Sequence, residues 1–150
     1  MPDVSDLSSH TGYLLRSVSN AVSQEFARRV AVEGVTVAEW VMLRALYDSD
    51  AIAPSVLARK MGMTKGAISK LADRLLSKGL VQRHGNPEDT RSHSLTLSME
   101  GLRKVPILAC LADGNDAAFF AGMGPESQGH LRALLQDLIK RHGLTVMPVD

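Results

Sequence analysis

Cysteine is almost absent from this sequence, and long apolar runs are missing altogether. The 150 residues include one cysteine, Cys110, so no disulfide can form within the chain. No apolar stretch approaches the roughly 20 residues that a membrane-spanning helix needs. The opening residues PDVSDLSSH are polar and acidic, unlike a secretory leader. Because a chain of this length can bury a sizeable core, we expect one domain in a cytoplasmic protein.

Catalytic and metal-binding motifs are also missing. There is no nucleophile elbow, phosphate-binding loop or pair of acidic catalytic residues, so we expect neither an enzyme nor a cofactor. The five histidines include no pair at helical i, i+4 spacing and none beside the cysteine. His84 and His93 could face each other across a hairpin, which makes them the best metal candidates. A solvated or phosphate-contacting role is still the expected one, and we predict no metal site.

The net charge is only +1, but it is unevenly distributed. Residues 55–104 contain ten basic and four acidic residues, whereas the remainder contains seven basic and twelve acidic ones. A basic segment in an acidic frame suggests a surface that faces phosphates. Two alternatives stay open: a solvated helix face whose charges have no partner, and a basic face that binds an acidic protein. Salt-dependent retention on random duplex DNA would separate DNA binding from protein binding.

Two short helical patterns lie in this basic segment, with a tight turn between them. The first begins at Pro54, which suits a helix start because it lacks an N–H, and ends at Gly62. Thr64 can cap the second helix, which Gly79 ends. The apolar stripe of the second helix consists of Ala67, Ile68, Leu71, Leu75 and Leu76. The sequence therefore predicts a helix-turn-helix.

The second helix would expose a face of small and basic residues. Its outward residues are Lys65, Gly66, Ser69, Lys70, Asp73 and Arg74. Small or basic side chains around a helix start allow close approach to base edges in the major groove. We therefore predict a recognition helix that reads bases with its first turns and contacts phosphates at its edges. The expected base-facing residues are Lys65, Gly66, Ser69 and Lys70, and the expected phosphate-facing residues are Thr64, Arg74 and Lys78.

A hairpin should follow the recognition helix. Residues 80–84 and 93–97 alternate in polarity and flank the tip GNPEDTRS, which is rich in turn formers. The tip places Arg91 at the end of a thin projection, where its guanidinium could enter the minor groove. Asp89 would instead hold the shape of this wing or pair with Arg74, because a carboxylate is repelled by phosphate.

These motifs together resemble the MarR family of bacterial transcription regulators. The resemblance rests on GMTKGAISKLADRLLSKGLVQR, on the wing residues Asp89, Thr90, Arg91 and Ser92, and on the following LTLSMEG. An Asp-x-Arg-Ser wing eight residues after a Lys-Gly-Leu-Val strand entry is more specific than a helix-turn-helix alone. The resemblance covers nearly the whole chain. It implies a mainly α fold with a small β wing, and a ligand-responsive repressor that binds a near-palindromic operator.

Helical patterns flank the DNA-binding segment on both sides. Residues 6–32 form one amphipathic pattern, and the capping box Thr36 to Glu39 starts a second that reaches about residue 48. Residues 49–53 could add one short strand to the hairpin. After the wing, Ser98 can cap a long pattern through Phe119, in which Pro106 should introduce a bend and which could be one helix or two. A last helix runs from 125 to about 142.

Apolar stripes at both ends of the chain predict a homodimer. A small central module cannot cover them, and in the resembled family the terminal helices of two subunits interlock. We therefore expect a single domain over 1–150, with dimerisation helices in 1–35 and 98–150 and a winged module in 36–97. Such a dimer would place two recognition helices about 34 Å apart, in successive major grooves.

The resemblance also implies an effector site between the dimerisation helices and the module. In the family, small and often aromatic anions bind there. The residues that map to its lining are His10, Tyr13, Arg16, Trp40 and Arg44. Tyr13 and Trp40 could supply ring faces and Arg16 a counter-charge, although core packing is the commoner role for Trp40. Cys110 has apolar neighbours, and we expect it to be a buried packing residue without a redox role.

Overall fold

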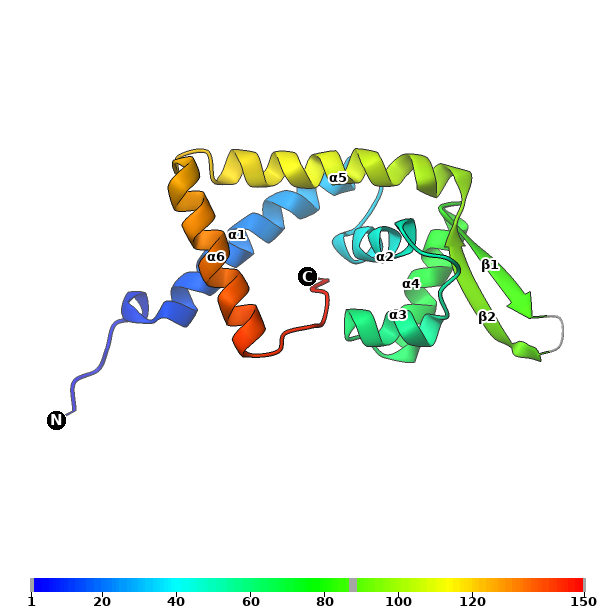
Figure 1. Cartoon of the computed structure of the whole chain (residues 1–150), viewed down its shortest axis with the longest axis horizontal. Coiled ribbons are helices and arrows are strands. Elements are labelled where there is room, and N and C mark those ends of the chain that lie inside the picture. The colour runs from blue at the N-terminus through cyan, green and yellow to red at the C-terminus, as the bar shows by residue number, and fades with distance from the viewer. Residues whose placement is uncertain (1, 87–88, 150) are drawn as a thin grey trace.

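The computed structural model describes residues 2–86 and 89–149, and the side chains of residues 86–92 lie outside that description. The fold is mainly α with one two-stranded antiparallel sheet, as predicted. In chain order its elements are η1 (Leu7–Ser9), α1 (Thr11–Ala31), α2 (Val37–Tyr47), α3 (Pro54–Met61), α4 (Lys65–Ser77), β1 (Val81–Asn86), β2 (Asp89–Leu97), α5 (Met99–Phe119) and α6 (Pro125–Arg141) (Figure 1).

The first helix begins later than its apolar pattern suggested. A short 3-10 turn occupies Leu7–Ser9, and His10 has extended backbone angles before α1 starts at Thr11. The Ser9 hydroxyl and the Ser9 N–H both donate to the Asp6 carbonyl, at 2.6 and 3.0 Å. Such local bonds compete with helix hydrogen bonding, which explains why the α-helix does not extend to residue 6.

The predicted caps are present at three other helix starts. Glu39 N–H donates to Thr36 Oγ1 at 3.2 Å and Thr36 N–H donates to Glu39 Oε1 at 2.8 Å, so the capping box before α2 is complete. Thr64 Oγ1 accepts from Ala67 N–H, and Ser98 Oγ from Gly101 N–H, both at 3.1 Å. Beyond Ser98, α5 continues through Pro106 as one helix.

Glycine ends both helices of the helix-turn-helix, as predicted. Gly62 and Gly79 have φ values of +62° and +72°, in the left-handed region that costs other residues energy. The turn between α3 and α4 is therefore short and defined. It places the start of α4 directly after the end of α3.

The core lies inside the winged module. Its fully buried side chains include Leu43 of α2, Leu57 of α3, Leu75 of α4 and Leu95 of β2, each worth about 1.5–3 kcal/mol on burial. The predicted strand before α3 is reduced to a single bridge between Ile52 and Leu95. From outside the module, Val105 and Leu108 of α5 join the same core. Helix α5 is thus fixed to the module at its N-terminal half.

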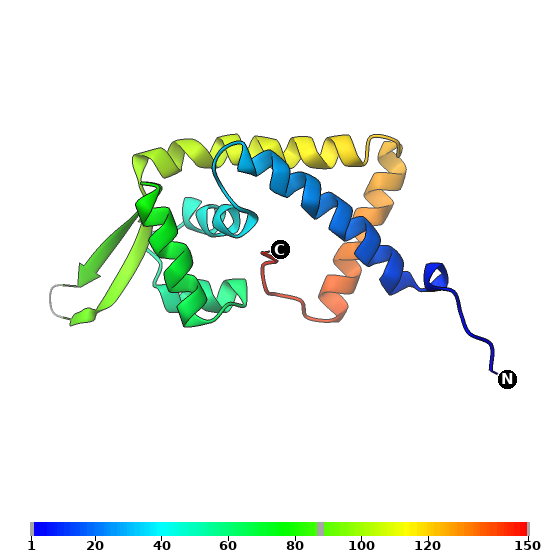
Figure 2. The same ribbon diagram turned by 180° about the vertical axis from the view of Figure 1, so that it is seen from behind.

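The two ends of the chain form a separate frame. Helix α5 runs from the wing to α6, and α1 and α6 lie at the end of the molecule remote from the wing (Figures 1 and 2). Their apolar stripes remain at the surface of the single chain. The exposed members are Leu14, Leu15, Val18, Leu134, Leu135, Leu138 and Ile139. Contiguous apolar surface of this kind marks an interaction site.

Candidate nucleic-acid interface

Helix α4 buries its predicted stripe and exposes its predicted basic face. Ile68, Leu71 and Leu75 are buried, together with Ala72. All six residues of the expected outward face are exposed, from Lys65 to Arg74. Among the residues that the structure describes, no carboxylate pairs with Lys65 or Lys70. The first two turns of α4 therefore offer unneutralised positive charge to a partner.

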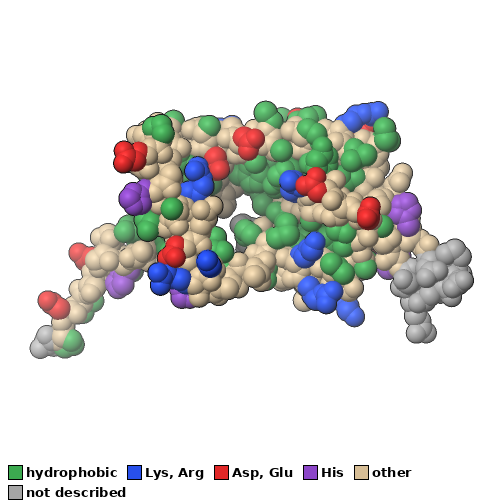
Figure 3. Space-filling model, in the orientation of Figure 1, with side chains coloured by type: hydrophobic (Ala, Val, Ile, Leu, Met, Phe, Trp, Pro, Cys, Tyr) green, Lys and Arg blue, Asp and Glu red, His purple; other side chains and the backbone are tan. Residues whose placement is uncertain are grey.

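A shallow pocket extends this face across the turn onto α3. It has a volume of about 450 Å³, and its lining includes Ser55 and Arg59 of α3, Gly62 at the C-cap of that helix, and Lys65 of α4. Lysine and arginine side chains gather on this side of the module in Figure 3. Arg59 was not among the predicted contacts, although its place in the last turn of α3, one helical turn before Gly62, could have indicated it.

The wing has the predicted hairpin form. Strands β1 and β2 pair antiparallel, with Val81 opposite Leu97 and His84 opposite Ser94, and the register shifts at Gly85 and Asn86. The predicted roles of Arg91 and Asp89 fall on side chains outside the described part of the structure. Their backbone belongs to β2, on the projecting hairpin.

The two hairpin histidines do not face each other. His93 pairs with Gly85, and His84 Nε2 is hydrogen-bonded to Thr96 Oγ1 at 2.7 Å. The expected opposition fails because the register places them one residue pair apart. Among the side chains that the structure describes, which exclude those of residues 86–92, no group of three metal-ligating side chains comes together.

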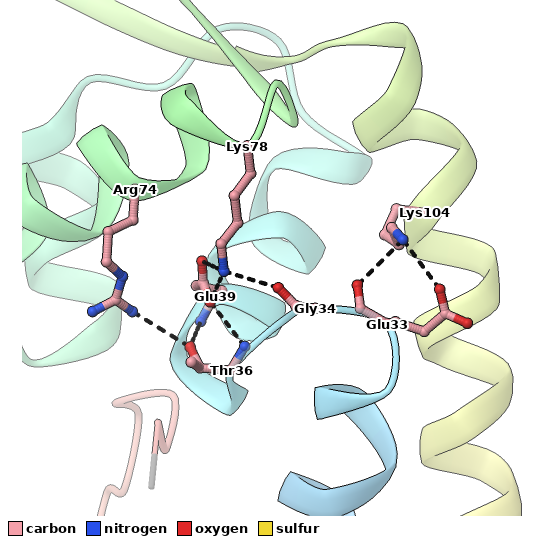
Figure 4. A network of polar contacts seen from close by, with 7 residues as sticks. All are labelled: Glu33, Gly34, Thr36, Glu39, Arg74, Lys78 and Lys104. Atoms are coloured by element: carbon pink, nitrogen blue, oxygen red, sulfur yellow. Dashed lines mark hydrogen bonds and ion pairs between the residues drawn. The ribbon is translucent and has the colours of Figure 1, made fainter.

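A buried ion pair holds the C-terminal end of α4. Lys78 Nζ lies 2.9 Å from Oε1 and 2.8 Å from Oε2 of Glu39, whose side chain is fully buried, and also donates to the Gly34 carbonyl at 2.8 Å (Figure 4). Lys78 was expected near phosphate. Its ammonium is instead committed to α2 and to the loop before it, so it positions the recognition helix.

The pKa of Glu39 is lowered by this arrangement. Burial acts to raise it, but the hydrogen bonds from Lys78 and from Thr36 together with the Lys78 charge outweigh burial. A carboxylate with a lowered folded-state pKa contributes stability that is present above its unfolded value of 4.5. That contribution is lost as the pH falls through the folded value.

Substituting Lys78 should lower the free energy of unfolding by more than substituting Glu39 does. Lys78→Ala leaves a fully buried carboxylate without its cation, and we expect a loss of about 2–3 kcal/mol at pH 7. Glu39→Gln should cost less, about 1–2 kcal/mol, because Lys78 is 39% exposed and can turn to solvent. Urea unfolding at pH 7 and pH 3.5 measures both. The deficit of Glu39→Gln should shrink at the lower pH; a constant deficit would contradict a lowered Glu39 pKa.

Other basic residues near α4 also have internal partners. Arg83 contacts Asp73 at 3.1 Å, and Arg74 Nη2 lies 3.5 Å from Thr36 Oγ1. Lys104 of α5 pairs with Glu33 at 3.1 Å, so the loop between α1 and α2 is held from both sides (Figure 4). Among the described side chains of the predicted set, Lys65, Lys70 and Arg74 therefore have no acidic partner, and Arg74 alone of these three contacts another side chain.

The five residues mapped to an effector site lie in two places. Trp40 and Arg44 line a pocket of about 370 Å³ together with Phe26, whose ring meets Trp40 edge-on at 6.5 Å between centroids. His10, Tyr13 and Arg16 do not line it; His10 is exposed just before α1, and Tyr13 and Arg16 are exposed in the first turns of that helix. Trp40 is half-buried and packs against the core, in line with the packing role expected for it. Within one chain, the five therefore do not converge.

Cys110 differs from its expectation, since it is exposed. Its neighbour Leu108 is fully buried. Residues two apart on an α-helix point about 200° apart, so apolar neighbours in sequence do not share a face. The packing role is not supported in the single chain.

Sequence reasoning missed two further features. Glu39 was recognised as a cap, but its ion pair with Lys78 was not, because the two residues are far apart in sequence. The segment after α6 had no periodicity, yet Met147 and Pro148 line the Trp40 pocket.

In the described part of the chain, no helix is both long and apolar enough for a membrane span.

Comparison with known proteins agrees with this geometry. Residues 33–92, which extend from the loop before α2 into strand β2 of the wing, match the family model described as MarR family. A putative transcriptional regulatory protein for the hcr operon of Thauera aromatica is 28% identical over 135 residues, covering 89% of this chain and 81% of that protein.

Two solved structures extend the likeness to the whole fold. The crystal structure of a probable transcriptional regulator from Pseudomonas aeruginosa has a TM-score of 0.78 and 27% identity, covering 89% of this chain and all of that one. A Mycobacterium tuberculosis MarR family protein in complex with salicylic acid has a TM-score of 0.69 and 26% identity, covering 87% and 96%. Residues 33–92 thus form a winged helix-turn-helix that matches the MarR family model, and the whole chain is similar in sequence and fold to bacterial transcription regulators.

Proposed function

We propose that this protein regulates transcription by binding a near-palindromic operator as a homodimer, with α4 in the major groove. The observation that carries the proposal is the exposed start of α4, where Lys65 and Lys70 have no acidic partner among the described residues. Small residues lie between them, so the helix can approach base edges closely. Lys78 and Arg83 are paired with Glu39 and Asp73, so the free positive charge lies toward the N-terminal turns of α4.

The role of each contact follows from its place on α4. Gly66, Ser69 and Lys70 face outward in the first two turns and would read bases, while Thr64 and Arg74 lie at the edges, nearer the phosphates. Arg91 remains proposed for the minor groove, and Asp89 for the shape of the wing. Lys78 is left out of the contact set because Glu39 and Gly34 hold it.

A second copy would complete the reading surface. The exposed apolar residues of α1 and α6 supply the interface, and α5 connects that interface to the wing and the module. Two α4 helices held about 34 Å apart would meet successive major grooves on one face of B-DNA. The proposed division into dimerisation helices, 1–35 and 98–150, and a DNA-binding module, 36–97, follows from this arrangement.

An aromatic anion is the proposed effector. The M. tuberculosis relative was solved with salicylic acid, and in this chain Trp40, Phe26 and Arg44 supply ring faces and a positive charge in one pocket. His10, Tyr13 and Arg16 could join such a site only from elsewhere in the assembly. An effector releases DNA only if it binds the DNA-incompetent arrangement more tightly than the competent one.

Gly66→Ala separates DNA reading from folding. A Cβ at Gly66 meets no atom within 4 Å, so the variant should fold as well as the parent and gain up to about 0.5–1 kcal/mol of helix stability. The added methyl would keep α4 from the base edges, and we expect duplex affinity to fall on the order of tenfold. Fluorescence anisotropy with labelled duplex DNA and thermal unfolding measure the two effects.

The matched control is Gly129→Ala in α6, where a Cβ also meets nothing within 4 Å. It should gain similar stability and bind DNA as the parent does. If Gly66→Ala binds DNA as tightly as Gly129→Ala, close approach at the start of α4 is not part of recognition.

A further inference from the structure

The chain beyond α6 turns back onto the helix-turn-helix. Met147 N–H donates to the Lys60 carbonyl at 2.8 Å. Lys60 lies in the last turn of α3, where carbonyls have no partner within their own helix. Both ribbon views show this segment leaving the end of α6 and reaching toward α2 and α3 (Figures 1 and 2). A backbone bond thus joins the frame to the module.

Side chains of this segment cover two features of the module. Val146 lies over Gly62, so closely that a Cβ there would be 2.6 Å from Val146 Cγ1. Val149 packs against the core. Between them, Met147 and Pro148 form one wall of the pocket that Phe26, Trp40 and Arg44 line from the other side.

We infer that residues 144–149 form a strap that closes the Trp40 pocket and competes with any molecule that enters it. Among the described residues, one backbone hydrogen bond ties the strap to the module, and the side chains that help to hold it are themselves half-exposed or exposed. Segments with so few buried contacts open far more readily than the core around them. Met147 and Pro148 line one side of the pocket, so a molecule larger than its volume of about 370 Å³ must displace them.

Opening of the strap would also remove contacts from the turn that leads into α4. Val146 and Met147 contact the end of α3, and Gly62 there begins the short turn that leads to Thr64 and the recognition helix. Releasing the strap frees that turn from α6. This consequence rests on the proposed function, whereas closure of the pocket does not.

Trp40 allows a direct test, because it is the only tryptophan in the sequence. Acrylamide, a small neutral quencher, reports access to its ring. Met147→Ser/Val149→Ser removes two of the apolar side chains that hold the strap, and quenching of Trp40 should rise on the order of twofold as the open state becomes the populated one. Leu144→Ser is the control, since Leu144 belongs to the same segment but is 58% exposed; it should quench as the parent does.

A covalent lock tests the opposite state. In a Cys110→Ser background, Gly62→Cys and Val146→Cys place two Cβ atoms about 3.7 Å apart, which suits a disulfide. The left-handed φ of +62° makes the backbone of the Gly62→Cys variant strained in both the reduced and the oxidised form. In the oxidised disulfide variant, acrylamide should quench Trp40 no more than it does in the parent, and the strap substitutions should no longer raise the quenching. Reduction of the disulfide should restore their effect. Circular dichroism confirms that each variant is folded.

Equal quenching in the parent, the Met147→Ser/Val149→Ser variant and the control would overturn the inference. So would failure of the cysteine pair to oxidise in folded protein, because the strap would then not lie on Gly62. DNA affinity of the locked and released forms is compared on the same duplex at the same salt concentration, and identical affinities would contradict the coupling to α4. A parent that binds no DNA would contradict the proposed function, while the quenching result still decides the strap.

Discussion

Leu134→Asp/Leu138→Asp should convert the protein from a dimer into a folded monomer and reduce operator affinity by a factor of about 10² or more. The two leucines lie one turn apart on α6 and are 58% and 42% exposed in the single chain. Carboxylates at these positions stay solvated in a monomer but would be buried without partners in a dimer interface. The monomer must bind each half-site independently and so loses the gain of linked binding.

Sedimentation and DNA titration measure this pair of effects. The control is Gln136→Asp/Lys140→Asp, which places carboxylates on α6 at the same i, i+4 spacing but on the side away from the apolar stripe. It should remain a dimer. A parent that sediments as a stable monomer at micromolar concentration would remove the basis for two half-sites.

Gly101→Ala should destabilise the fold by about 2–4 kcal/mol, among the largest effects of any single methyl in this chain. A Cβ at this position would lie 2.1 Å from the Leu80 carbonyl oxygen and 3.1 Å from its carbon. That oxygen already accepts from Ser98 N–H at 3.0 Å, so β1, the α5 cap and the first turn of α5 meet there. The backbone cannot give way without breaking this junction between wing and frame.

Gly114→Ala in the same helix is the control for Gly101→Ala. Its Cβ would meet only Arg29 Nη1, at an ordinary 3.6 Å, so the usual gain of about 0.5–1 kcal/mol should appear. The melting temperatures of the two variants should then shift in opposite directions, by about 2–4 °C for each kcal/mol of changed stability. Equal melting temperatures for the two variants would show that Gly101 does not make this close contact.

Local patterns predicted the parts of the fold that local interactions determine. Thr36 and Glu39 are three residues apart, so their capping box is visible in the sequence, and the left-handed glycines 62 and 79 follow from where each apolar stripe ends. The start of α1 could not be predicted in this way, because the Ser9 bonds to Asp6 O compete with an otherwise helical pattern.

Contacts between distant segments were beyond pattern reading. Lys78 looked like a phosphate ligand because it follows a basic helix, but the buried Glu39 takes its charge. The segment around Met147 has no periodicity, and only the folded chain shows that it reaches Lys60. The basic face of α4 could be predicted in full, since one helix alone determines which of its residues point outward.

The most direct test of DNA binding by α4 is the salt dependence of binding to labelled random duplex DNA. If Lys65 and Lys70 meet the duplex, Lys65→Ala/Lys70→Ala should flatten the slope of log affinity against log salt concentration by about two. The control is Arg28→Ala/Arg141→Ala, which removes the same charge from exposed positions on α1 and α6 and should leave the slope near that of the parent. Equal slopes for all three proteins, or equal flattening in both variants, would contradict an interface on α4.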